Sequence, residues 1–175
     1  MKLASLNDGS KDGQLIVVSK DLTKFISATD IAPTMQNAMD NWDNIFDELN
    51  MLSKNLNSGK INSIEFEPKN VLSPLPRAYQ WADGSAYVNH VHLVRKARGA
   101  EMPDSFWSDP LMYQGGSDDF IPPLAPIYLP DESWGIDMEG EIAIITGNVK
   151  MGASPIESIN SIRLLMLVND VSLRN

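Results

Sequence analysis

The chain has 175 residues, of which 43% are hydrophobic and 21% charged, so it can bury a core and has the composition of an ordinary globular protein. Its net charge of −9 argues against nucleic acid as a partner, because nucleic-acid binders concentrate Lys and Arg on one face. The absence of cysteine excludes disulfides, a thiolate nucleophile and cysteine-bound zinc or iron–sulfur centres.

No stretch approaches the length needed to span a membrane, and the first residues lack the apolar run of a signal peptide. We therefore expect a cytosolic protein with neither a membrane nor a nucleic acid as partner. A small carboxylate substrate is compatible with the charge, since one local arginine can outweigh a distant negative balance.

The first third of the sequence predicts a small module of strands and one helix. Three short apolar runs, at residues 2–7, 13–19 and 24–29, are separated by turn-forming residues, which predicts an antiparallel meander. From residue 34 to 56 apolar side chains recur at spacings of three and four, which predicts an amphipathic helix that Gly59 ends.

A stretch rich in proline separates this module from the rest. Residues 65–76 contain three prolines, which remove amide donors and favour extended backbone. We place a boundary at Pro68, with a β-meander and helix module over 1–68 and the main domain over 69–175. The predicted class is α+β.

The middle of the chain brings several reactive side chains together. Asp83, Tyr87 and His90 fall within eight residues. A helix is expected over residues 91–98, with His90 near its start and with Val91, either Leu93 or Val94, and Ala97 facing inward. The aromatic-containing stretch 102–120 predicts a long ordered loop, a kind of segment that often carries function.

Carboxylates open the strand-like run at residues 135–146. Glu139 and Glu141 are two apart and therefore share a face, which continues with Ala143 and Ile145. The opposite face is apolar too, so the acids should lie where the strand enters a core. Repulsion between them favours a shifted pKa or a bound cation, whereas the alternative is a solvated edge strand.

A second strand repeats this design. Ser154, Pro155 and Glu157 match a capping box that starts a short helix, and an apolar run from residue 162 then ends in Asn169 and Asp170. Three segments therefore each bring acids to the edge of a core: Asp83, the pair Glu139 and Glu141, and Asp170. Together they form an oxygen-rich site suited to a hard divalent cation.

The order of these motifs resembles the fumarylacetoacetate hydrolase family. Asp83 precedes His90 by seven residues, a Glu-x-Glu strand follows at Glu139 and Glu141, and an Asn-Asp-x-Ser strand end lies at 169–172. The resemblance runs from about residue 71 to the end, and the first module is similar to the small β domain that precedes the catalytic domain in larger members.

The resemblance implies a β-rich mixed β-roll, usually dimeric, around a metal site. It assigns His90 as general base and Tyr113 as a substrate contact, beside which Tyr87 is a second candidate; packing under a loop is the alternative for both tyrosines. A structural histidine is the alternative for His90. The implied ligands of Mg²⁺ or Ca²⁺, with Mn²⁺ also suitable, are Asp83, Glu139, Glu141 and Asp170.

The activity implied is hydrolytic cleavage of a carbon–carbon bond in a β-diketo acid such as fumarylacetoacetate or an acylpyruvate, as in aromatic amino acid catabolism. An ion held by carboxylates is a Lewis acid for the enolate, and histidine takes a proton from water near neutral pH without a large pKa shift. The alternatives are a metal-dependent decarboxylase or isomerase of keto acids, and an inactive folding or assembly module.

The sequence departs from the family pattern in two places. Leu93 stands where some branches carry a glutamate that partners the histidine, and the sequence stops shortly after Asp170, whereas members continue much further. We therefore expect an incomplete roll without the lysine that holds the substrate. Unpaired strands and uncovered apolar surface would then favour a homodimer or higher oligomer.

Overall fold

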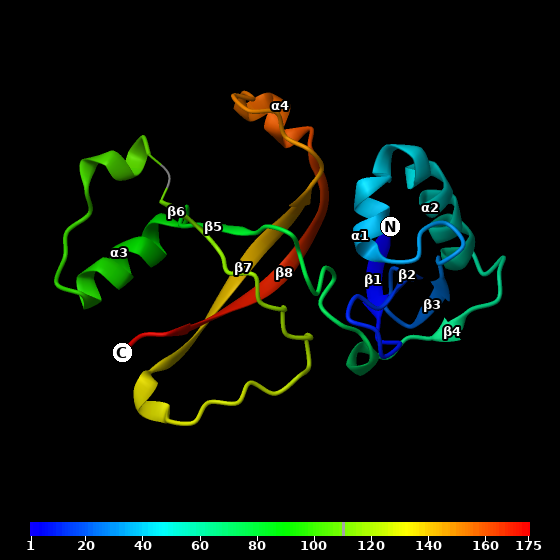
Figure 1. The fold of residues 1–175 in the computed structure, drawn as a ribbon, viewed down its shortest axis with the longest axis horizontal. Helices are drawn as coiled ribbons and strands as arrows, with labels where there is room; N and C mark the ends of the chain where they lie inside the picture. The colour runs from blue at the N-terminus through cyan, green and yellow to red at the C-terminus, as the bar shows by residue number, and fades with distance from the viewer. Residues whose placement is uncertain (110) are drawn as a thin grey trace. The chain divides into compact units, whose positions relative to one another are not determined.

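A computed structural model describes residues 1–109 and 111–175 (Figure 1). The chain divides into two compact units, one made of Met1–Leu75 with Ile121–Asn175 and the other of Pro76–Phe120. The described part contains four α-helices and three small antiparallel sheets, so the chain mixes helices and strands as expected. No described helix has the length and apolar character needed to cross a membrane.

The N-terminal sheet confirms the predicted meander. Strands β1 (Lys2–Leu6), β2 (Gln14–Val18) and β3 (Lys24–Ser27) pair antiparallel in chain order. A fourth strand, β4 (Ile64–Glu65), adds to the edge of β3. Its two residues are too few for a periodic pattern, which is why the sequence did not reveal it.

The prediction of one continuous helix over residues 34–56 is wrong. The structure has α1 (Met35–Asp40) and α2 (Trp42–Asn57), separated at Asn41. The amide nitrogen and the side-chain Nδ2 of Asn41 both donate to the carbonyl oxygen of Asn37, at 3.2 and 3.0 Å. Such local side-chain bonds compete with regular helix bonding. Gly59, with a φ of +70°, follows the end of α2 as expected.

The main hydrophobic core lies between α2 and the N-terminal sheet. Leu15 and Val17 of β2 are fully buried against Leu49 of α2, and Leu164 of the C-terminal strand β8 (Ile162–Leu173) packs on the same cluster. The remaining buried members are Ala28, Ala32, Met35, Ala38, Trp42 and Leu56. Among the described residues, none of the candidate site residues belongs to this core.

The C-terminal part of this unit is a long two-stranded sheet. Strands β7 (Ile136–Thr146) and β8 (Ile162–Leu173) pair antiparallel along their whole length (Figure 1). Between them lies α4 (Pro155–Ile159), whose capping box is present as predicted. A 3-10 turn, Glu132–Trp134, precedes β7. The expectation that the second strand ends at Asp170 is wrong, because pairing continues to Leu173, opposite Ile136.

The expectation that both faces of β7 enter a core is also wrong. Ile142 is 74% exposed and its cross-strand partner Leu167 is 85% exposed. Met138 and Ile144, on the same face of β7, are exposed as well. The physical reason is that a two-stranded sheet has two faces, and among the described residues only the face bearing Ile145 is covered.

The unit Pro76–Phe120 contains a short sheet and a helix. Strand β5 (Ala82–Gly84) pairs antiparallel with β6 (Met112–Gln114), and α3 (Val88–Ala97) lies between them in sequence. Val91 is buried as expected, but Ala97 is exposed because it lies in the last turn. The stretch expected to be a loop contains β6 and a 3-10 turn, Asp104–Trp107; another such turn, Pro68–Asn70, belongs to the first unit.

Candidate metal centre

The acids of the C-terminal sheet face one another across the strand pair. Glu139 on β7 is the direct register partner of Asp170 on β8, and Glu141 is the partner of Val168. Directly opposed residues of an antiparallel pair project to the same face. A carboxylate oxygen of Glu141 accordingly lies within 4.8 Å of one of Asp170.

The face that carries these acids is the more covered one. Glu139, Glu141 and Asp170 are half-buried, and farther along β7 the same face carries half-buried Ala143 and buried Ile145. The shared face predicted for these β7 residues is therefore confirmed. Like charges that face one another in partly desolvated surroundings are unfavourable unless a cation offsets them.

Arg174 supplies positive charge to this face, and sequence reasoning gave it no role. Its Nε and Nη2 atoms lie 3.1 and 3.0 Å from Oδ2 of Asp137, and Nη2 also contacts Oε1 of Glu139. The Ser172 hydroxyl donates to the same Oε1 at 3.3 Å. The two-residue spacing of Asp170, Ser172 and Arg174 was the available signal, since it places all three on one face of an extended chain.

In the other unit Asp83 lies beside Tyr113. The two are direct partners in the β5–β6 pair, so their side chains share a face, and Asp83 is half-buried. The Tyr113 ring packs edge-on against Trp81, with ring centroids 5.9 Å apart. Trp81 in turn donates from Nε1 to the carbonyl oxygen of Gly116 at 2.8 Å. The structure thus brings Asp83 and Tyr113 together on a supported strand pair.

His90 lies in the first turn of α3 and is half-buried. The helix begins three residues earlier than the sequence indicated, because its first turn includes Val88 and Asn89. Tyr87 is the N-cap residue and its side chain is largely exposed. The structure therefore gives His90 a partly enclosed position and leaves Tyr87 on the surface of its unit.

Two family models match the chain. The model described as fumarylacetoacetase N-terminal domain 2 matches residues 1–77, and the one described as fumarylacetoacetate (FAA) hydrolase C-terminal matches residues 80–175. The chain belongs to the fumarylacetoacetate hydrolase family. This confirms the resemblance read from the motifs, and no curated protein matches the chain. Membership indicates an enzyme of the hydrolase, isomerase or decarboxylase kind.

The family's typical requirement for a divalent metal fits the donors on the β7–β8 sheet. Glu141 and Asp170 bring carboxylate oxygens close together, and hard cations such as Mg²⁺ and Ca²⁺ prefer such oxygens. Glu139 lies opposite Asp170, with its Oε1 in contact with Arg174 and Ser172. These three acids project from one antiparallel strand pair and are half-buried, so an ion there would relieve their mutual repulsion. The chemistry of the donor set therefore suits a divalent ion.

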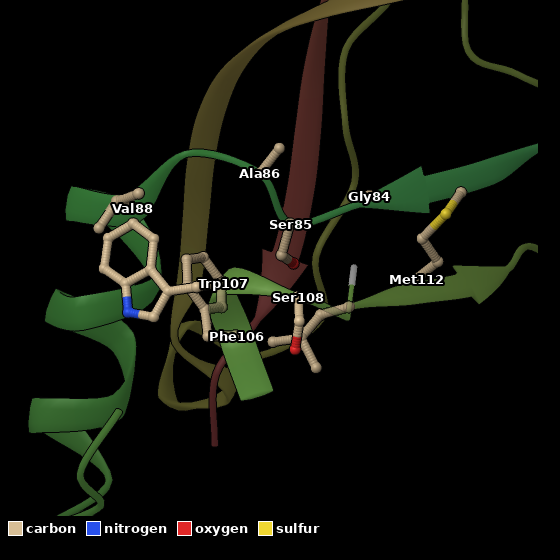
Figure 2. Close-up of a pocket in the computed structure, with 9 residues that line it drawn as sticks. Gly84, Ser85, Ala86, Val88, Phe106, Trp107, Ser108 and Met112 are labelled. Atoms are coloured by element: carbon tan, nitrogen blue, oxygen red, sulfur yellow. The ribbon is translucent and has the colours of Figure 1, made fainter. Parts of the chain in front are cut away.

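A cavity of about 480 Å³ lies in the unit Pro76–Phe120 of this family member (Figure 2). Phe106 and Trp107 form one wall, with ring centroids 5.6 Å apart. Gly84 and its register partner Met112 also line it. Because neighbouring strand residues alternate between faces, the cavity opens on the side of β5–β6 away from Asp83 and Tyr113.

Proposed function

We propose that this chain is a metal-dependent hydrolase that cleaves a carbon–carbon bond in a β-diketo acid of the fumarylacetoacetate or acylpyruvate type. The observation that carries the proposal is the placement of Glu139 directly opposite Asp170, with Glu141 on the same half-buried face. These acids lie in residues 80–175, which match the hydrolase domain of the family.

The proposed ligands are Glu139, Glu141 and Asp170 on the β7–β8 sheet and Asp83 on β5. Asp83 enters the proposal through the sequence pattern that links it to His90 and the Glu-x-Glu strand. The ion is Mg²⁺ or Ca²⁺, with Mn²⁺ as a substitute. When bound, it polarises the carbonyl oxygens of a 1,3-dicarbonyl and stabilises the enolate that leaves.

His90 is the proposed general base. It removes a proton from water, whose oxygen then bonds to the carbonyl carbon; the adjacent carbon–carbon bond breaks, and its electron pair leaves as an enolate that His90 can reprotonate. Leu93, one turn after His90, carries no carboxylate to orient the imidazole. Tyr113, on the Asp83 face, and Tyr87, before α3, are the proposed substrate contacts.

The mixed β-roll and a homodimer or higher oligomer are part of this proposal. The exposed apolar face of β7–β8 supports association, since such faces are normally covered. A keto-acid decarboxylase or isomerase on the same metal site, and an inactive assembly module, are the other outcomes that the experiments below separate. The proposed location is the cytoplasm.

Metal binding is the first test. Calorimetry with Mg²⁺, Mn²⁺ and Ca²⁺ should detect binding to the wild type and its loss in Glu141→Gln, Asp170→Asn and Asp83→Asn. Glu48→Gln, which removes an exposed carboxylate from α2, is the matched control and should bind as the wild type does. A wild type that binds none of the three ions contradicts the metal site and favours the assembly module.

Product analysis then identifies the reaction. With an acylpyruvate the proposal predicts pyruvate and the free carboxylic acid in equal amounts, and a large loss of rate in His90→Ala. The control is His92→Ala, an exposed histidine on the same helix. Release of carbon dioxide from a keto acid, with no acylpyruvate cleavage, would instead identify a decarboxylase.

A further inference from the structure

Two donors meet one oxygen of Glu139. Nη2 of Arg174 contacts Oε1, and the Ser172 hydroxyl donates to the same atom at 3.3 Å. The Glu139 side chain is only 13% exposed, so these are contacts to a carboxylate that water reaches poorly. Charge-assisted bonds of this kind fix the orientation of a carboxylate more firmly than water does.

Arg174 is itself held from two sides. Its Nε and Nη2 both lie within 3.1 Å of Oδ2 of Asp137, two residues before Glu139 on the same face of β7. Its backbone amide donates to the carbonyl oxygen of Gly135 at 3.0 Å, which extends the strand pairing by one residue. The guanidinium therefore reaches Glu139 from a fixed anchor rather than from a free surface chain.

We propose that Arg174, anchored on Asp137, is a positioning residue that together with Ser172 holds Oε1 of Glu139, so that Glu139 binds the divalent ion through its second oxygen. The inference rests on the proposed metal site and adds to it the three side chains that orient one ligand. Carboxylates that bind metals are commonly hydrogen-bonded in this way, and loss of such a partner weakens metal binding about 10- to 100-fold.

The direction in which the metal affinity changes distinguishes an orienting role of Arg174 from a simple effect of its charge. A cation beside a metal site repels the incoming ion, so removing its charge alone tightens metal binding. Removing a group that orients a ligand weakens binding. Lysine keeps the charge but has a single nitrogen, so it loses the second contact, from Nε to Asp137, that fixes the guanidinium of Arg174. Arg174→Lys therefore tests orientation at constant charge.

The experiment measures the affinity for Mg²⁺ and Mn²⁺ by calorimetry, with the full chain in each case. We expect Arg174→Gln and Arg174→Lys to bind about 10-fold or more weakly than the wild type, and Ser172→Ala to bind more weakly by a smaller factor. The matched control is Arg163→Gln. Arg163 is similarly covered, 25% exposed against 29% for Arg174, but it pairs with Asp43 at 2.9 Å.

The outcomes are distinct. Unchanged or tighter binding by Arg174→Gln, or wild-type affinity in Arg174→Lys, overturns the positioning role while leaving the metal site intact. If thermal unfolding shows that Arg174→Gln does not fold, Asp137→Asn replaces it as the test, because this substitution loosens the anchor but keeps Arg174. We expect Asp137→Asn to bind metal more weakly than the wild type. Binding with wild-type affinity would overturn the positioning role of Arg174. Failure of the wild type to bind metal is a failure of the proposed function itself.

Discussion

Gly115 stands against the indole ring of Trp81 so closely that no side chain fits between them. A β-carbon built on Gly115 would lie 1.8 Å from a ring carbon of Trp81. Trp81 also packs against Tyr113 and against Phe120, at centroid distances of 5.9 and 5.6 Å. The glycine is thus a steric requirement of the aromatic cluster that supports the Asp83–Tyr113 strand pair.

Gly115→Ala should therefore displace Trp81 and destabilise the unit Pro76–Phe120. Overpacking of this kind typically costs about 1–3 kcal/mol. We expect the Trp81 indole N–H resonance to shift and the amides of β6 to exchange faster with solvent. The neighbouring Gly116→Ala is the control, because its nearest contact is an Asp118 oxygen at 3.7 Å. Equal effects of the two substitutions would contradict the steric explanation.

Asp170→Asn should leave stability without metal unchanged or slightly higher, and it should remove the response to metal. Glu139 faces Asp170 directly, and like charges in that arrangement oppose strand pairing by a few tenths to about 1 kcal/mol. In a chelator, Asp170→Asn should melt at or slightly above the wild-type temperature. At an Mg²⁺ concentration of about 100 times Kd the wild type should gain roughly 2.7 kcal/mol, and the variant should gain little.

The control for this prediction is Asp47→Asn, which removes an exposed carboxylate from α2. It should change neither the melting temperature in chelator nor the gain with Mg²⁺. A variant Asp170→Asn that is clearly less stable than the wild type in chelator would show that Asp170 has a structural role beyond metal binding.

Asp21 should titrate well below an ordinary aspartate. The Ser19 hydroxyl donates to its carboxylate at 2.6 Å and the Thr23 hydroxyl at 2.8 Å, and these bonds lower the pKa of Asp21 from 3.8 to about 2. Because the folded pKa is depressed, the stability that Asp21 contributes is fully present above pH 3.8. It is lost as the pH falls through that value toward 2.

An NMR titration of the Asp21 carboxyl carbon checks this value. Ser19→Ala removes the largest cause and should raise the pKa of Asp21 toward 3.8. Ser27→Ala is the control, since the Ser27 hydroxyl pairs with Thr29 and does not reach Asp21. An ordinary pKa for Asp21 in the wild type would show that these hydroxyls do not hold the carboxylate in solution.

Features determined by neighbours in sequence could be predicted. The N-terminal meander follows from apolar runs between turn residues, and the capping box at Ser154 and Glu157 follows from their three-residue spacing. The shared face of Glu139 and Glu141 follows from strand alternation alone. The break at Asn41 was missed because periodicity continues through it, while a local hydrogen bond to Asn37 interrupts the helix.

Features determined by register could not be predicted in the same way. That Glu139 faces Asp170 depends on how β7 and β8 align, and the sequence of either strand does not specify this. The contacts of Arg174 with Asp137 and Glu139 depend on the same alignment. The motif order identified the family and named the acids, whereas the residues that orient them became visible only in the folded pair.

The exposed apolar face of β7–β8 should drive self-association. Ile142 and Leu167 are direct partners at 74% and 85% exposure, and with Ile144 and Leu165 they form a continuous apolar surface. Burial of such a face against a second copy removes apolar area from water, which is favourable by about 25 cal/mol per Å². We expect light scattering to show concentration-dependent oligomers, and Leu167→Lys to shift the population toward monomer.

Met151→Lys separates the effect of this face from the effect of added charge. Met151 is fully exposed in the turn between β7 and α4, away from the strand pair, so the substitution adds the same charge without touching the apolar surface. Met151→Lys should leave the fraction of oligomer and the binding of a hydrophobic dye unchanged. Leu167→Lys should lower both the oligomer fraction and the dye binding. A wild type that stays monomeric at high concentration and binds no such dye would show that this face is not exposed in solution, contrary to the homodimer or higher oligomer proposed here.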